Sequence, residues 1–391
     1  MSAVSDAVRV ARATLLRVSE ASTPLVRHVR AHGVEATLAD IRAGAPIPDV
    51  DVAALQLRLA DADGGRDLSL AATVGARLVC PGDDEWPSLL DDLVRVDADS
   101  FGLWVRGPLR LDEACGRAVA IVGTRTPTAY GEHVAGELAA GLADRLWTVV
   151  SGLAYGIDGV AHRAALAAGG MTVGVLACGI DVVYPTGHRQ LVDRLAAEGL
   201  VVSEHPPGAA PQRHRFLVRN RIIAALSLGT VMVEAARRSG ARSTLNHSRD
   251  LLRHTMVVPG PVTSALSAGC HTALREIPGC VLVTRTEEVI EQVGHMGELA
   301  DPLSGPVRAR DRLGPLVRRV FDAVPVHRAA PAQRIALTAC VGAEAVEPSL
   351  AALQALGLVE RTTEGWRMSR AGRDERRADA RPDRALPLDW L

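Results

Sequence analysis

Seven short apolar runs recur along the middle of the chain, and each is separated from the next by a segment long enough to form a helix. Parallel strands that are buried on both faces need no polar alternation, and they require long crossovers that are usually helical. The pattern therefore predicts an α/β fold with an extended Rossmann-like, doubly wound parallel sheet. The runs cover residues 119–122, 148–150, 172–177, 200–202, 230–233, 255–258 and 281–284.

The segment before the sheet predicts a separate helical domain. A length of 391 residues suggests two to three domains, at about 150 residues each. Capping and helix-breaking residues predict three short helices, at 7–18, 24–31 and 35–41, and therefore a small helical bundle over residues 1–50. Residues 51–297 are assigned to the central domain, which includes a strand pair around an acidic turn, at 76–79 and 102–105.

The segment after the sheet predicts a linker and a third domain. Residues 298–310 are polar and contain prolines, as in a linker. Residues 311–370 show three helical stretches and then two strand-like ones, the order of a winged helix, and the mixed charge of 371–391 predicts a flexible tail. A winged helix usually reads duplex DNA with its third helix. Here Glu344 and Glu347 flank the start of that helix, which favours a packing or protein-contact role.

The charge distribution predicts local rather than overall attraction for nucleic acid. The formal net charge is −1, and all 44 basic residues are arginine. The planar fork of arginine can grip a phosphate through two donors at once. Between Glu204 and Glu234 the sequence has no acidic residue. Within that segment lies the one concentrated basic patch, which consists of Arg213, Arg215, Arg219 and Arg221.

Cysteine spacing and the apolar runs exclude several classes of protein. The six cysteines contain no CxxC pair, which argues against a structural zinc site or a disulfide framework. The start of the sequence lacks the basic flank and apolar core of a signal peptide, and no run approaches the ~18 apolar residues of a membrane span. These features predict a cytoplasmic protein without membrane contact.

Glycine-containing turns follow the first two runs of the sheet. Gly123-Thr124-Arg125 ends the first run, and the turn from Ser151-Gly152 to Gly156 ends the second. Glycine lets backbone amides approach an anion, and the helix that follows directs its positive end there. The two turns together predict sites for neighbouring phosphates, with Arg125 as countercharge. Each turn alone is equally explained as a tight connection, and neither is a dinucleotide fingerprint or a P-loop.

Candidate catalytic groups are few. Asp158 and His162 stand four residues apart on a predicted helix, a spacing that suits an acid/base pair, although helix capping and core packing explain them more simply. Glu234 follows a strand and is either a general base or the partner of a loop arginine. No complete catalytic constellation is recognisable, so the sequence predicts a protein that is not an enzyme and has no cofactor or metal.

Ordered motifs over residues 8–370 resemble those of the DNA-processing protein A (DprA/Smf) family. The resemblance implies that the N-terminal bundle is of the helix-hairpin-helix or SAM-like type and that the C-terminal domain is the winged helix many members carry. The motifs occupy residues 120–125, 149–154, 156–158, 161–162, 179–185, 203–204, 206–208, 216, 219–224, 233–235, 239–240 and 258–260.

The resemblance implies sequence-independent binding of single-stranded DNA, a homodimer, and loading of the RecA recombinase during transformation and recombination. Phe216 would stack on a base or pack in the core. The candidate DNA- and phosphate-binding residues are Gly123, Thr124, Arg125, Ser151, Gly152, Gly156, Phe216, Arg219, Asn220, Arg221, Ser239, Gly240 and Arg242.

Three residues depart from the pattern of the family. Tyr155 stands where a basic residue is usual, Leu217 where proline is usual, and His271 where asparagine is common. The alternative is a nucleotide-processing enzyme of the nucleoside-monophosphate phosphoribohydrolase type, since such enzymes use a related architecture. The Pro-Gly-Gly-x-Gly-Thr loop that precedes their catalytic glutamate is absent from this sequence.

Overall fold

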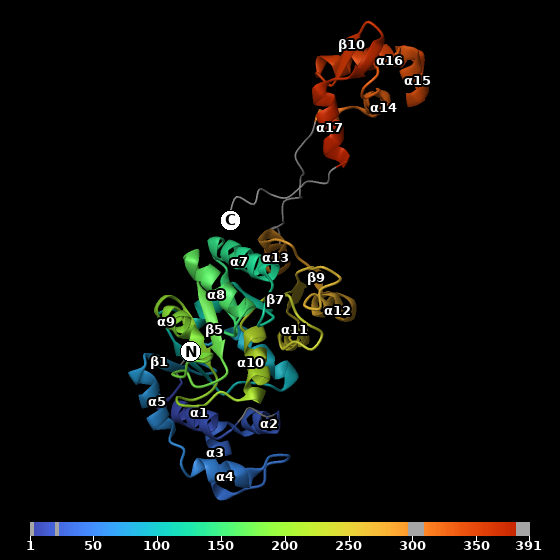
Figure 1. Cartoon of the computed structure of the whole chain (residues 1–391). Coiled ribbons are helices and arrows are strands. Elements are labelled where there is room, and N and C mark those ends of the chain that lie inside the picture. Colours follow the sequence, from blue (N-terminus) through green and yellow to red (C-terminus); the bar gives the residue numbers. More distant parts are fainter. Residues whose placement is uncertain (1–3, 20–22, 296–308, 381–391) are drawn as a thin grey trace. The chain divides into compact units, whose positions relative to one another are not determined.

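The computed structural model describes residues 4–19, 23–295 and 309–380 and divides into two compact units, Met1–Asp301 and Pro302–Leu391 (Figure 1). Residues 298–308 of the predicted linker lie outside the described residues, and 309–310 begin a short 3-10 helix, η3 (Ala309–Arg312). The finer domain boundaries stay predictions.

Five helices precede the sheet, and the first three match the predicted ones to within two residues. Ser5 caps the first, because its hydroxyl accepts a hydrogen bond from the amide of Val8. The fourth and fifth helices lie beyond residue 50, yet they pack against the first. Figure 1 shows the first four in blue below the sheet. The helices are α1 (Asp6–Val18), α2 (Thr23–His32), α3 (Val34–Ala43), α4 (Val52–Leu59) and α5 (Gly64–Thr73).

A nine-stranded sheet forms the centre of the first unit, in the order β1-β2-β6-β5-β4-β3-β7-β8-β9. The seven predicted strands are all present as β3 to β9, and they pair with one another in parallel. The predicted strand pair is β1 and β2, which extends the sheet antiparallel to β6. The strands are β1 (Ala76–Val79), β2 (Leu103–Arg106), β3 (Ala118–Gly123), β4 (Thr148–Ser151), β5 (Thr172–Leu176), β6 (Leu200–Ser203), β7 (Gly229–Val233), β8 (His254–Val257) and β9 (Val281–Leu282).

Helices cover both faces of the sheet, which confirms the doubly wound fold. Val119 and Ile121 of β3 pack with α7, α8 and α13, whereas Ala120 and Val122 pack with α10, α11 and α12. This alternation buries both faces of a strand that has no polar side chain to expose. The connecting helices are α6 (Leu111–Cys115), α7 (Ala129–Asp144), α8 (Ile157–Ala167), α9 (Arg189–Glu198), α10 (Arg213–Ala225), α11 (Ala241–Asp250), α12 (Ala268–Glu276) and α13 (Thr286–Val293), with 3-10 helices η1 (Ser88–Val96) and η2 (Thr186–His188).

The winding of the chain reverses between β3 and β7. From β3 the chain passes through β4, β5 and β6 on one side, and it then returns to the other side of β3 to form β7, β8 and β9. Adjacent connections leave such a point in opposite directions and open a crevice outside the carboxyl ends of the strands. The sheet order therefore places a ligand-binding crevice where β3 and β7 end.

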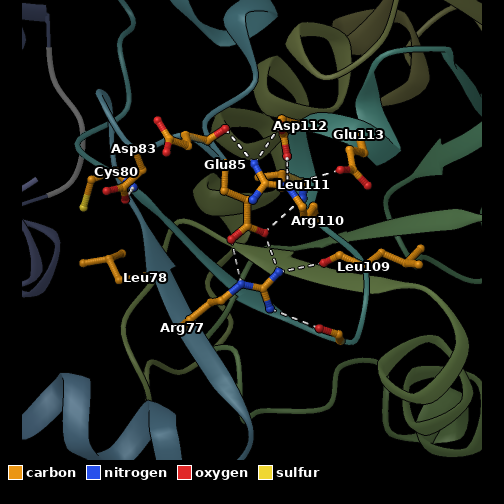
Figure 2. Close-up of polar contacts among 12 residues, drawn as sticks. Arg77, Leu78, Cys80, Asp83, Glu85, Leu109, Arg110, Leu111, Asp112 and Glu113 are labelled. Carbon is orange, nitrogen blue, oxygen red and sulfur yellow. Dashed lines mark hydrogen bonds and ion pairs between the residues drawn. The ribbon is translucent and has the colours of Figure 1, made fainter. Parts of the chain in front are cut away.

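An arginine on β1 holds the acidic turn that follows this strand. Nε of Arg77 donates to the Glu85 carboxylate at 2.8 Å, and its Nη atoms donate to the carbonyls of Gly107 and Leu109. The Glu85 carboxylate also accepts the amide of Leu111 at 3.0 Å. Figure 2 shows Arg77 between Glu85 and the backbone that follows β2. This contact ties the turn to the beginning of α6.

Replacing Arg77 with alanine is expected to lower the free energy of unfolding by about 1–2 kcal/mol, because the half-buried Glu85 carboxylate loses its charged partner. Urea denaturation followed by circular dichroism measures the change. Arg95→Ala is the matched control, since Arg95 is 56% exposed and pairs with Asp92 three residues away, and it is expected to cost less than about 0.5 kcal/mol. Equal losses in the two variants would contradict the assignment.

The second unit has the predicted order of three helices and a hairpin, packed around Phe321 and Trp366. A flexible tail from residue 371 was expected, but α17 (Arg370–Ala380) is helical, so that expectation is wrong for residues 371–380. Residues 381–391 lie outside the described residues.

Among the described helices, none is by itself long and apolar enough to span a membrane. The bent pair of α15 (Ala332–Ala339) and α16 (Ala343–Ala355) has the required length and apolarity only when the two helices are counted together. The other elements are α14 (Pro315–Ala323), α15 (Ala332–Ala339), α16 (Ala343–Ala355), β10 (Val359–Thr362) and β11 (Gly365–Met368).

Candidate nucleic-acid interface

A pocket of about 290 Å³ opens in the crevice between the ends of β3 and β7. A smaller pocket of about 50 Å³ adjoins it, and Arg125 and Phe216 line both. Gly152 lines the smaller pocket. The structure thus gathers most of the predicted site residues, which come from segments far apart in the sequence. Those in the larger pocket are Gly123, Thr124, Arg125, Phe216, Arg219, Asn220, Ser239 and Gly240.

The two glycine-containing turns interlock at the floor of these pockets. The amide of Thr124 donates to the carbonyl of Glu234 at 2.7 Å, and the carbonyl of Thr124 accepts the amide of Ile157 at 3.1 Å. Gly123 is needed because a Cβ there would lie 2.0 Å from the carbonyl oxygen of Val233. Gly156 is needed because its φ is +79° and a Cβ would meet the carbonyl of Thr124 at 2.3 Å. The turns are therefore held by backbone contacts and are built before any ligand arrives.

An internal carboxylate occupies the amides of the second turn. One oxygen of Asp158 accepts the amides of Gly152 at 3.1 Å and Ala154 at 3.4 Å. Burial raises the pKa of Asp158, against the opposing effects of Arg219 and these amides. The amides of this turn were expected to bind an external phosphate, but they already donate to a side chain of the protein itself. Asp158 lies in the first turn of α8, and its side chain takes the place that an external anion would need.

Two of the four arginines of α10, Arg219 and Arg221, are buried, whereas Arg213 is exposed and Arg215 is half-buried. Arg219 is buried and donates to the carbonyls of Gly152 (2.6 Å) and Val175, and burial lowers its pKa to about 10. Arg221 is also buried, and it donates two hydrogen bonds of 2.8 Å to Glu204. The side chains of residues two apart on a helix point roughly 200° apart. Of Arg219 and Arg221, therefore, only Arg219 lines the larger pocket.

Four predicted residues line neither pocket. The Ser151 hydroxyl is buried and donates to the carbonyl of Ile121 at 2.6 Å. Gly156 has a positive φ that the second turn requires, and Arg221 forms an ion pair with Glu204. Arg242 donates to the carbonyl of Arg237 and to Glu276, both at 3.0 Å. The structure therefore does not bring these four residues into the crevice with the others, and their assignment as DNA-binding residues stays a prediction.

Arg125 is the exposed cation of the crevice. Its guanidinium lies 5.5 Å from the ring centre of Phe216, and among the described residues it forms no ion pair. Phe216 is half-buried and contacts Tyr184 with ring centres 5.3 Å apart. Asp158 supplies the only carboxylate along the described walls of either pocket. The rim therefore presents one available positive charge beside aromatic rings.

Two aromatic residues of this rim went unrecognised as site residues in the sequence analysis. Tyr184 was noted only as part of a motif, and Tyr155 only as a departure from a family pattern. Both line the smaller pocket together with Phe216. The chain has only three tyrosines and three phenylalanines, so the presence of a tyrosine in the loop after β4 and in the loop after β5 was the available signal.

The candidate catalytic groups have structural roles. Nδ1 of His162 lies 2.7 Å from the Thr172 hydroxyl, and burial lowers the pKa of His162 to about 3. Glu234 accepts the amide and hydroxyl of Thr128 at 2.8 and 2.5 Å, which anchors the start of α7 rather than an arginine. Within the described ranges, no cluster of three His, Cys, Asp or Glu side chains has the geometry to hold a metal ion.

Comparison with known proteins points to one family. A family model described as DNA recombination-mediator protein A matches residues 77–294. A putative DNA processing protein DprA of Mycobacterium tuberculosis is 50% identical over 314 residues, which covers 78% of this chain and 80% of that protein.

Two solved structures are also similar. The X-ray structure of DNA processing protein A from Streptococcus pneumoniae superposes with a TM-score of 0.61 at 30% identity, covering 72% of this chain and 96% of that one. A structure that concerns the single-stranded DNA binding mode of DNA processing protein A from Helicobacter pylori has a TM-score of 0.48 at 28% identity, covering 53% and 91%.

Proposed function

Because the chain belongs to the DNA recombination-mediator protein A family, we propose that it binds single-stranded DNA without regard to sequence and mediates recombination. The observation that carries the proposal is the position of Arg125, exposed between two pockets and stacked against Phe216. Contacts to phosphate position a strand without reading its sequence, and aromatic faces accept any base. A site of this composition suits an unpaired strand.

The roles of the site residues follow from their exposure. Arg125 contacts a backbone phosphate, and Phe216 stacks on a base. Arg219 is buried and acts through its positive charge on the pocket rather than by contact. The amide of Asn220 holds the loop after β7 through the carbonyl of Gly240, at 3.2 Å. Arg221 and Arg242 are left out of the proposed DNA contacts.

Replacing Arg125 with alanine is expected to weaken binding of a single-stranded oligonucleotide about tenfold, the value of a charged hydrogen bond of about 1.5 kcal/mol. The slope of log K against log salt should fall by about 0.7, since one phosphate contact is lost. Fluorescence anisotropy at several salt concentrations measures both.

Arg194→Ala is the control for this prediction. Arg194 lies on α9, is 48% exposed and pairs with Glu198, and its removal should leave affinity and slope unchanged. Competition with a duplex oligonucleotide tests the preference for unpaired DNA. An Arg125 variant that keeps the wild-type slope would count against the proposal.

The proposal includes a homodimer and delivery of DNA to a RecA-type recombinase during transformation and recombination. The mediator role is supported by the description of the family as a recombination mediator. Sedimentation tests the dimer. Assembly of recombinase filaments on single-stranded DNA, with and without substoichiometric amounts of this protein, tests the delivery. Filament assembly that does not respond to the protein would remove the mediator part and leave DNA binding untouched.

The enzyme alternative is not supported by the geometry at Glu234. Its carboxylate is 5% exposed and already accepts two hydrogen bonds from Thr128, so it is poorly placed to accept a proton from a substrate. Incubation with nucleoside monophosphates and a search for free base would test it directly.

A further inference from the structure

A groove of about 480 Å³ lies between the N-terminal helices and the segment that joins β1 to β2. One wall comes from α1 and α2, and the other comes from η1 and the loops on either side of it. Ligand sites usually measure about 300–1,000 Å³, so this groove, here called the α2–η1 groove, has room for one. It shares no lining residue with either pocket of the crevice. Its apolar walls include Val26, Val29, Trp86, Leu90, Val94 and Phe101.

Arg12 lines the groove and has no carboxylate partner among the described residues. Its side chain is half-buried, its Nη1 donates to the carbonyl of Phe101 at 2.9 Å, and its Nε is buried without a hydrogen-bond partner in the described ranges. The other two arginines of α1, Arg9 and Arg17, are both paired with aspartates. Burial lowers the pKa of Arg12. A guanidinium that has lost water without gaining a carboxylate favours the binding of an anion.

Apolar side chains stand exposed beside this charge. Val94 is 44% exposed, although it is a large apolar residue, and Trp86 is half-buried. The indole Nε1 of Trp86 donates to Asp91 at 2.9 Å, which holds the ring in place. An apolar wall next to a cation suits a ligand in which an anionic group lies close to an apolar one.

The carboxylates of the groove argue against a nucleic acid as that ligand. Asp91 and Asp99 both line the groove, and Oδ1 of Asp99 is buried without a partner among the described residues. A strand carries one negative charge on every phosphate, so successive phosphates would be repelled by these side chains. A protein segment can place a single carboxylate on Arg12 and keep its remaining contacts apolar.

Ion pairs join the two walls of the groove. Arg27 and Arg30 of α2 pair with Asp97, which ends η1, at 2.5 and 3.1 Å. Arg30 also pairs with Asp99 at 2.6 Å. Walls that are already joined need little rearrangement when a ligand binds, and this lowers the cost of binding.

We propose that the α2–η1 groove docks a short segment of a partner protein in which one carboxylate stands beside a large aliphatic or aromatic side chain. The carboxylate pairs with Arg12, and the apolar side chain packs against Trp86 and Val94. Charge complementarity at Arg12 carries the proposal, and the exposed apolar wall sets the second requirement. The inference does not depend on DNA binding, because different residues line the groove and the crevice.

The test begins with a phage-displayed library of random heptapeptides, which is selected on the immobilised full-length protein. Enriched peptides are expected to combine aspartate or glutamate with a neighbouring tryptophan, phenylalanine, leucine or isoleucine. Each is synthesised with a fluorescent label, and its affinity is measured by anisotropy. Changing the carboxylate of such a peptide to the amide should weaken its binding to the wild-type protein about tenfold, as for the loss of one charge-assisted hydrogen bond.

Two variants assign the binding to the groove. Arg12→Gln keeps a donor for the carbonyl of Phe101 and removes the charge, so it should bind the acidic peptide about tenfold more weakly and should no longer distinguish it from the amide form. Val94→Glu puts a negative charge at an exposed position of the groove and should also weaken binding. It keeps the test decisive if circular dichroism shows that Arg12→Gln does not fold.

Leu57→Glu is the matched control, because Leu57 lies on α4, is 78% exposed and is not among the lining residues of the groove. It should bind the acidic peptide as the wild type does. All three variants should bind a single-stranded oligonucleotide and sediment as the wild type does.

The outcomes are distinct. Enriched peptides that lack a carboxylate, or that bind both groove variants as tightly as the wild type, would overturn the docking site. Weaker oligonucleotide binding by the folded groove variants would assign the groove to DNA, and a changed sedimentation of Val94→Glu would assign it to a second copy of the chain; either result overturns the proposal. Arg125→Ala should bind the peptide normally, so its effect on DNA binding decides the proposed function separately.

Discussion

Replacing Glu204 with leucine is expected to lower the free energy of unfolding by about 3–5 kcal/mol, the cost of leaving a buried charge without its partner. Glu204 follows β6, and its side chain is 9% exposed, while that of its partner Arg221 is 5% exposed. Two hydrogen bonds of 2.8 Å join them. Leucine removes both hydrogen bonds and leaves the buried guanidinium of Arg221 without a charged partner. Urea denaturation measures the loss.

The double variant Glu204→Leu with Arg221→Met separates the missing partner from the altered shape. Replacing both members of a buried pair by apolar residues of similar volume is often close to neutral, so the double variant should recover most of the stability. A double variant no more stable than the single one would show that the packing around the pair, not its charge, is what leucine disturbs.

The same pair makes stability depend on pH. Burial alone would raise the pKa of Glu204, but the charge and hydrogen bonds of Arg221 outweigh it and leave that pKa below its ordinary value. The ion pair therefore contributes fully to the free energy of unfolding at pH values above the pKa of about 4.3 that Glu204 has in the unfolded chain. This contribution is lost as the pH falls through the lower pKa that Glu204 has in the folded protein. Wild-type protein should lose this increment of stability on acidification, and the double variant should not.

Replacing Asp158 with alanine is expected to lower the free energy of unfolding by about 2–4 kcal/mol, because the buried amide of Gly152 and the half-buried amide of Ala154 lose their acceptor. Affinity for single-stranded DNA should fall as well, since the freed turn carries Tyr155 at the mouth of the smaller pocket. Denaturation and anisotropy on the same preparations measure the two effects.

Asp158→Asn is the control for that prediction. Both amides donate to the same oxygen of Asp158, and an asparagine oxygen can accept both. Burial raises the pKa of Asp158 and so disfavours its charged form, which means that a neutral amide fits the site at little cost. We expect a change below about 1 kcal/mol. If asparagine were as damaging as alanine, the charge rather than the acceptor would be the essential property.

The sheet was predictable because its signal is local. Each of the seven strands contains consecutive apolar residues, and strands that are buried on both faces are mainly apolar. The position of the crevice was predictable in the same way, since the turns of Gly123 and Gly152 directly follow strands whose carboxyl ends must meet at one edge. Arg125 was therefore assigned to this region from its turn, whereas Phe216 was assigned to it through the resemblance to the family.

Side-chain partners depend on distant segments and were not predictable. Arg219 and Arg221 look alike in the sequence, yet the first contacts the carbonyl of Gly152 and the second contacts Glu204. Asp158 gave no sign that it would occupy the amides of the preceding turn. Tyr155 and Tyr184 stand 29 positions apart (184 − 155) and meet at one pocket only because β4 and β5 are neighbours.

The amino-acid sequence by itself determined the parallel sheet, its helical crossovers and the turns at its rim, because burial of apolar runs and the backbone freedom of glycine are properties of short segments. Only the tertiary structure decided which arginine stays exposed, which carboxylate fills the second turn and which aromatic rings share a pocket. Those outcomes depend on how charges and rings from distant segments find partners once the sheet has brought them together.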